Sequence, residues 1–138
     1  MIEKINLKDK AYSNPNLFEY INIGYLNNHS LNIINQENKS LNFHIHEETD
    51  EFFYCIQGEF DIEFRDGITH LIEGDITIVP KGISHRPVCK GFSTCLLIER
   101  DESITRLDKR EEKTDIPINK VETKILHAPS NISLEMTK

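Results

Sequence analysis

Two histidines and a glutamate lie close together in the sequence, at His44, His46 and Glu51. A single residue separates the histidines, so on a β-strand both imidazoles project from the same face. Glu51 begins a run of aromatic and β-branched residues, which predicts a further strand. Two imidazoles and a carboxylate suit Fe(II), Mn, Ni, Zn or Cu. The pattern therefore predicts a site for one divalent metal ion.

A third imidazole follows a second group of turn residues. Gly74, Pro80 and Gly82 mark turns, and His85 stands shortly after the last of them. With His85 included, the predicted ligand set is three histidines and one glutamate, and coordination positions stay open for water or substrate.

The other histidines and the cysteines carry no such spacing. The lone imidazoles are interpreted as structural or solvated, and they are His29, His70 and His127. Cys55, Cys89 and Cys95 show no CxxC spacing, so they are interpreted as small buried hydrophobic residues. Cys55 follows Glu51 by four residues, so on one strand both side chains share a face, and we expect Cys55 to point into the same cavity.

Length and composition bound the class of protein. The chain has 138 residues, of which 38% are hydrophobic, which predicts one domain with a real core over residues 1–138. Its net charge of −7 argues against nucleic-acid binding. The apolar runs are too short to span a bilayer, and the first residues lack the apolar region of a signal peptide. We expect a cytoplasmic protein without a membrane partner.

Short apolar or alternating runs, each closed by a Gly or Pro turn, indicate strands. They are residues 20–25, 31–35, 41–46, 51–57, 59–65, 68–73, 76–79, 84–88 and 92–99. Residues 36–40 and Gly58 are predicted turns, and Asp66-Gly67 is a hairpin signal. The rhythm predicts an all-β antiparallel sandwich or barrel with its core at about residues 20–100, and no helix before residue 100.

The two ends differ from this pattern. The head is predicted to carry a short strand at Ile2, Ile5 and Leu7. Residues 108–115 are a mixed-charge run without an apolar residue, interpreted as a solvated loop. The rest of the 108–138 tail is predicted to be partly ordered, with a late strand and a frayed end. In the barrel, Phe52, Tyr54 and Ile56 should pack outward against a second layer or a partner chain.

The motifs His44-x-His46-x4-Glu51-x6-Gly58 and Gly74-x5-Pro80-x-Gly82-x2-His85 resemble the two signatures of the cupin superfamily. The resemblance runs from about Leu41 to Ile98 and is typical of small single-domain cupins labelled mannose-6-phosphate isomerase-like. Two positions depart from the pattern, because Asn38 stands where a glycine and Cys89 where an asparagine is expected.

The resemblance implies a double-stranded β-helix, or jelly-roll barrel, and a homodimer formed by sheet packing. It implies that the four ligand side chains point into the barrel and bind one divalent metal, and that the motif Gly and Pro residues serve turns. Groups that orient the imidazoles are also required, and the candidates are Glu48, Asp50 and Gln57.

The expected function is that of a small metal-dependent enzyme acting on a small molecule. Either a dioxygenase with Fe(II), or an isomerase, epimerase or lyase with a Lewis-acid metal, fits the ligand set. Candidates for an acid or base are Tyr25, Glu63 and Glu99. The few cations of the barrel region lie mostly at turns, which disfavours a phosphosugar isomerase. The alternative is a non-catalytic binding or sensing module whose metal is structural or absent.

Overall fold

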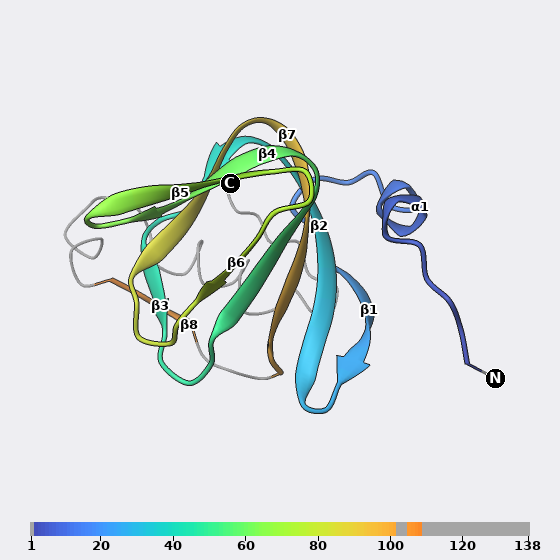
Figure 1. The fold of residues 1–138 in the computed structure, drawn as a ribbon, viewed down its shortest axis with the longest axis horizontal. Coiled ribbons are helices and arrows are strands. Elements are labelled where there is room, and N and C mark those ends of the chain that lie inside the picture. Colours follow the sequence, from blue (N-terminus) through green and yellow to red (C-terminus); the bar gives the residue numbers. More distant parts are fainter. Residues whose placement is uncertain (1, 102–104, 109–138) are drawn as a thin grey trace.

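The computed structural model describes residues 2–101 and 105–108 (Figure 1). Its elements are α1 (Leu7–Tyr12), β1 (Ile21–Leu26), β2 (His29–Ser40), β3 (His44–His46), β4 (Glu51–Phe64), β5 (Gly67–Ile72), β6 (Ile76–Val79), β7 (His85–Arg100) and β8 (Thr105–Leu107). The strands follow the order β1-β2-β7-β3-β8, and β4 pairs with β5, β6 and β7. This curled antiparallel sheet confirms the all-β prediction.

The long strands β4 and β7 form the centre of the sheet. They pair from Glu51, opposite Glu99, to Phe64, opposite His85. The prediction of a turn at Gly58 is wrong, because β4 continues through this residue with a shift of register between Gly58 and Asp61. Such a bulge lets one long strand bend and serve two parts of a curled sheet. The two strands predicted at residues 84–88 and 92–99 are likewise one continuous strand, β7, which pairs with β4 on both sides of the register shift.

Strand β2 also runs further than its sequence indicates. The polar residues 36–40, predicted to form a turn, pair with β7 as far as Ser40, opposite Val88. Their register shifts between Glu37 and Lys39, and Asn38 has a φ of 51°. Asparagine is one of the few residues besides glycine that adopt this left-handed conformation. The backbone thus explains why Asn38 can replace the glycine that the family resemblance leads one to expect.

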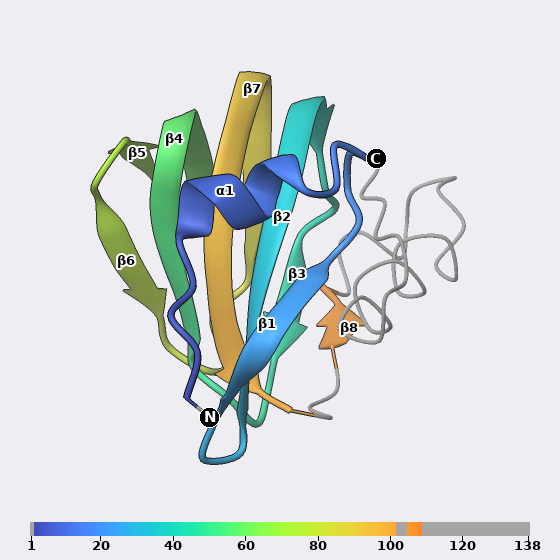
Figure 2. The same ribbon diagram turned by 90° about the vertical axis from the view of Figure 1, so that its right-hand side faces the viewer.

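A short helix stands where the head was predicted to be a strand. The side chain of Asn6 accepts a hydrogen bond from the backbone N–H of Asp9 at 3.0 Å and so caps the first turn of α1. Leu7 and Ala11 of this helix pack toward Ile33 and Ile56 in a small apolar cluster. Figure 2 shows α1 lying across β4, β7 and β2. A helix of only six residues is too short to show a clear apolar period in sequence.

This cluster covers two of the three residues of β4 that were predicted to face outward, Tyr54 and Ile56. Ile56 is buried in it, and Tyr54 packs against it together with Ile21 and Ile23 of β1. The predicted second layer over this face is therefore supplied by the chain's own first residues. The homodimer stays a prediction.

The main core lies on the opposite side of the sheet. It contains Phe18, Tyr20, Ile34, Leu41, Phe53, Cys55, Phe60, Ile62, Leu71, Val79, Cys89, Cys95, Leu97 and Leu107. A hairpin is present near Asp66-Gly67 as predicted, but its two turn residues are Arg65 and Asp66, because Gly67 already pairs with Phe64. Strand β8 pairs with β3 and was not predicted (Figure 2). The loop, strand and frayed end predicted for residues 109–138 lie outside the described residues. None of the described helices is long and apolar enough to cross a membrane.

Candidate metal site

The four predicted ligands meet inside the curled sheet. His44 and His46 come from β3, Glu51 begins β4 and His85 begins β7. All four are buried, and each offers one ligand atom such that these atoms lie within 4.8 Å of one another. His44 and His85 are direct partners across the sheet, which brings the two sequence motifs together. Metal binding by this set stays a prediction.

One carboxylate oxygen lies at the centre of the group. Glu51 Oε1 lies 2.8 Å from His85 Nε2 and 3.2 Å from His46 Nε2. The second contact lacks the alignment of a hydrogen bond, and His46 Nε2 has no hydrogen-bond partner in the described chain although it is buried. A buried nitrogen without a partner is unfavourable unless something else binds it. A divalent cation fits this position and this set of donors.

Backbone carbonyls orient two of the imidazoles. His44 Nδ1 lies 2.8 Å from the carbonyl oxygen of Asn42, and His85 Nδ1 lies 2.9 Å from that of Ile83. Because a carbonyl oxygen only accepts, each Nδ1 donates to it and each Nε2 is directed toward the group of ligands, where that of His85 contacts Glu51. His46 Nδ1 instead lies 3.0 Å from Thr105 Oγ1.

The predicted orienting residues have other roles. Asp50 accepts from the backbone N–H of Lys81 at 2.9 Å, and Gln57 donates to Thr94 at 3.0 Å. Glu48 is exposed. The true orienting groups were missed because a backbone carbonyl leaves no signal in sequence, and because Thr105 lies far along the chain from His46.

Burial and close contact shift the proton affinities of the group in opposite directions. Burial, and then the neighbouring His85 and His46, hold the pKa of His44 well below its usual value. Burial alone would lower the pKa of His46, but the carboxylates of Glu51 and Glu99 outweigh it and raise this pKa to about 9. Burial alone would raise the pKa of Glu51, but His46 and His85 outweigh it and hold that pKa below its usual range. Glu51 is therefore ionised and available as an anionic ligand.

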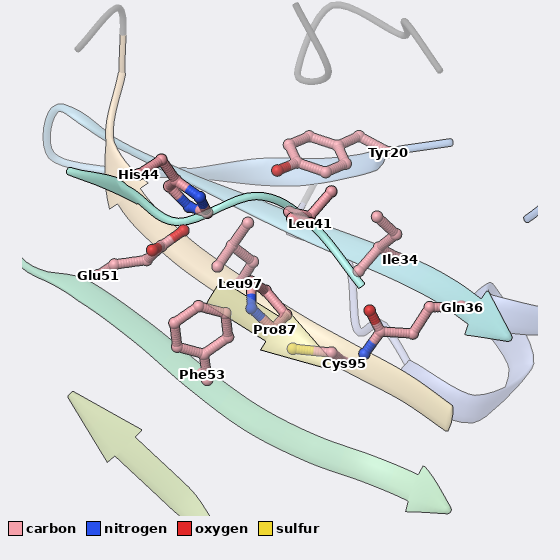
Figure 3. Close-up of a pocket in the computed structure, with 10 residues that line it drawn as sticks. All are labelled: Tyr20, Ile34, Gln36, Leu41, His44, Glu51, Phe53, Pro87, Cys95 and Leu97. Atoms are coloured by element: carbon pink, nitrogen blue, oxygen red, sulfur yellow. The ribbon is translucent and has the colours of Figure 1, made fainter. Parts of the chain in front are cut away.

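His44 and Glu51 form one end of a pocket in the main core (Figure 3). The pocket has about 400 Å³ of unoccupied space, part of it open to solvent, and a water molecule's centre can move through about 30 Å³ of it. Its lining residues are Tyr20, Ile34, Gln36, Leu41, His44, Glu51, Phe53, Pro87, Cys95 and Leu97. The site is thus enclosed mainly by apolar side chains, which keeps water away from it.

The cysteines are free and buried, as predicted. The expectation for Cys55 is wrong, because its Sγ points to the carbonyl oxygen of Gly58 at 3.3 Å and Cys95 lines the pocket instead. Alternation along β4 does place Cys55 on the inner face, but the register of β4 against β7 shifts directly after it, between Cys55 and Gln57.

Of the three candidate acids or bases, only Glu99 lies near the ligands. Its Oε1 is 3.6 Å from His46 Nδ1, and burial together with Glu51 raises the pKa of Glu99 to about 7. Glu63 forms an ion pair with Arg86 at 2.8 Å, and Tyr25 is exposed. Arg86 therefore faces away from the site, as expected. Tyr20, which lines the pocket, was not among the predicted residues.

His70 shows what a histidine outside the site does. It is half-exposed and lies between two carboxylates, with Nε2 at 2.9 Å from Glu59 Oε1 and Nδ1 close to Asp61 Oδ1. The hydrogen bond to Asp61, and then the one to Glu59, raises the pKa of His70 above its usual value. The Asp61→Asn variant should lower this pKa, which an NMR titration of the imidazole measures.

The sign of the accompanying stability change follows from linkage. Because the folded-state pKa of His70 exceeds the unfolded value, the contacts stabilise the protein below the unfolded pKa. This contribution is lost as the pH rises through the folded-state pKa. An unchanged His70 pKa in the variant would show that Asp61 does not hold the charged imidazole in solution.

Comparison with known proteins agrees with this geometry. Residues 33–99, which include all four ligands, match the family model described as Cupin domain. A cupin-2 domain containing protein from Shewanella frigidimarina is 29% identical with a TM-score of 0.67, and the match covers 70% of this chain and 93% of that one. Protein NMB1881 from Neisseria meningitidis is 25% identical with a TM-score of 0.64, over 71% and 99% of the two chains.

A sugar phosphate isomerase of the cupin superfamily from Silicibacter pomeroyi shares the fold. It is 20% identical with a TM-score of 0.57, over 64% of each chain. None of the curated proteins matches the sequence. The curled antiparallel sheet is thus a double-stranded β-helix, and the chain belongs to the cupin superfamily as one of its small members.

Proposed function

We propose that the protein is a metal-dependent enzyme that acts on a small molecule held beside His44, His46, Glu51 and His85. The observation that carries this proposal is the convergence of four buried ligand side chains at the end of an apolar pocket. A divalent ion bound there would supply a Lewis acid or a redox centre. Both classes of reaction that the ligand set predicts, oxidation by O2 and isomerase, epimerase or lyase chemistry, agree with this arrangement.

The protein's own residues would bind and orient the substrate. Phe53, Leu41 and Leu97 form apolar walls, so a substrate in the pocket is separated from bulk water. The backbone carbonyls of Asn42 and Ile83 hold two imidazoles in fixed orientations. Such preorganisation is what a metalloenzyme needs before the substrate arrives.

The lining disfavours a phosphorylated substrate. No lysine or arginine lines the pocket in the part of the chain that the structure describes. Arg65 lies 3.2 Å from Asp108 and Arg86 lies 2.8 Å from Glu63, and both guanidinium groups cover the ring of Phe43. A phosphate buried here would lack the paired cations that such a charge requires.

The first experiment is the metal content of protein purified without chelator, measured by elemental mass spectrometry. We expect about one equivalent of Fe, Mn, Ni or Zn in the wild type, and less than about a tenth of that in His46→Ala, because the variant loses one of four ligands. His29→Ala, which removes an exposed histidine outside the site, should keep the metal. No metal in the wild type after reconstitution would overturn the proposal. Iron would direct the next assays to oxygen consumption, and zinc or manganese to isomerase and lyase screens.

A second function, that of a cupin that binds a small ligand without converting it, agrees with the same pocket. Its lining is mainly apolar, and Glu99, the one predicted acid or base near the ligands, is not part of it. Product analysis after prolonged incubation of the metal-loaded protein with a bound ligand separates the two functions.

A further inference from the structure

The hydroxyl group of Tyr20 is a polar group in the pocket that the metal site does not use. Tyr20 is 6% exposed, and no hydrogen bond to its hydroxyl is formed within the described residues. Figure 3 shows its ring above the pocket, with the hydroxyl directed toward the end formed by His44 and Glu51. Burial, and then the carboxylates of Glu99 and Glu51, raise the pKa of Tyr20 well above its usual value. The hydroxyl therefore keeps its proton and can donate a hydrogen bond.

Gln36 provides a second unused polar group at the opposite end (Figure 3). It is 5% exposed, and its Nε2 donates to Ser93 Oγ at 3.0 Å. In this orientation of the amide, Oε1 lines the pocket and accepts no hydrogen bond from any described residue. A hydrogen-bond donor on a ligand in the pocket could therefore reach it.

The charge of the ligand set indicates which kind of ligand group would bind at the end of the pocket formed by His44 and Glu51. When the four ligands bind a divalent ion, the three imidazoles are neutral and the carboxylate carries one negative charge, so the ion and its ligands together carry a charge of +1. In a pocket lined by Ile34, Leu41 and Leu97, this charge favours an anionic oxygen ligand carrying a single charge. Tyr20 can donate to that same oxygen.

We propose that Tyr20 and Gln36 select the ligand, and that the ligand is a short molecule with a monoanionic oxygen group at one end, an apolar body and a hydroxyl or similar donor at the other. The anionic end lies between the metal site and the Tyr20 hydroxyl, and the donor end binds Gln36 Oε1. Apolar walls contact the body between them. This inference rests on the proposed function, because it needs the metal at the first end.

The test uses zinc-loaded protein and two series of probes, the straight-chain carboxylates from propanoate to hexanoate and their ω-hydroxy counterparts. Dissociation constants come from isothermal titration calorimetry. For one chain length, the wild type should bind the hydroxylated probe about tenfold more tightly than its unsubstituted counterpart, because only the former satisfies Gln36.

The variants separate the two roles. Gln36→Met should bind both probes of that length equally, because it keeps the shape and loses the acceptor. Ser93→Ala breaks the same Gln36–Ser93 bond but keeps the acceptor, so it should keep a preference for the hydroxylated probe. Tyr20→Phe should weaken both probes about tenfold and leave their ratio unchanged, whereas Tyr25→Phe, at an exposed tyrosine, should change neither.

The outcomes distinguish this inference from the proposed function. A wild type that takes up no zinc overturns the proposed function and this inference with it. A zinc-loaded wild type that binds no probe, or that binds both series equally, overturns only the inference. A preference that persists in Gln36→Met would likewise exclude Gln36 as the selecting residue.

Discussion

Replacement of Gly58 by alanine should lower the free energy of unfolding by at least about 3 kcal/mol. Gly58 has a φ of +78°, which a residue with a Cβ adopts at a cost. An added Cβ would also lie 2.2 Å from the carbonyl oxygen of Phe92 and 2.9 Å from Ser93 Cα. Both are backbone atoms of β7, so neither can rotate away, and the pairing of β4 with β7 must open. Urea denaturation measures the change.

Two other glycines serve as controls for this variant. Gly74 has a φ of +95° and open space around it, so Gly74→Ala tests the conformational cost without the clash. Gly91 has neither a strained φ nor a neighbour within 4 Å, so Gly91→Ala should change stability little. If Gly58→Ala were no less stable than Gly74→Ala, the close approach of β4 and β7 would not be what requires glycine here.

The Glu51→Gln variant should bind divalent metal more than about 100-fold more weakly than the wild type, which exceeds the usual effect of losing an outer hydrogen bond. Glu51 is the only carboxylate among the four predicted ligands, and its Oε1 lies within 3.2 Å of two imidazole nitrogens. The amide is neutral, and only its carbonyl oxygen can bind a cation, because its NH2 group is a donor. Competition with a chromogenic chelator measures the affinity.

The matched control is Glu48→Gln, because Glu48 is an exposed acid three residues away. This variant should retain wild-type affinity. Thermal unfolding of both variants without metal tests that they fold, and we expect the metal-free Glu51→Gln protein to be the less stable of the two, because the change removes the partner of the His46 imidazole inside the protein. Equal affinity in Glu51→Gln and the wild type would show that the carboxylate does not contact the metal.

The ligand positions could be predicted because they depend on local rules. One intervening residue puts His44 and His46 on the same strand face, and β3 obeys this alternation. The turn residues around Gly74 and Gly82 did mark turns, since both have positive φ. The fold class could also be predicted, because β5 and β6 are short strands that end at the turns of Gly74 and Pro80.

What could not be predicted depends on long-range pairing. The polar residues 36–40 resemble a turn, yet β7 extends them into β2 by pairing with their backbone. Gly58 also resembles a turn residue in sequence. In the structure it lies within β4 beside a register shift, close to the backbone of Phe92. Tyr20 lies just before β1, and no residue near it in the sequence indicates a functional role. Only the folded pocket shows that its hydroxyl faces the predicted ligands.

The three-residue length of β3 has a consequence for how fast a metal could leave the protein. Two of the four ligands, His44 and His46, lie on this strand, and a single residue pair, His44 with His85, joins it to β7. Glu51 and His85 instead belong to strands of 14 and 16 residues. Brief opening of β3 together with β8, which pairs with all three of its residues, would therefore release half of the ligands while the rest of the sheet stays folded. A bound metal would then exchange by local opening, at a rate independent of the rate of global unfolding.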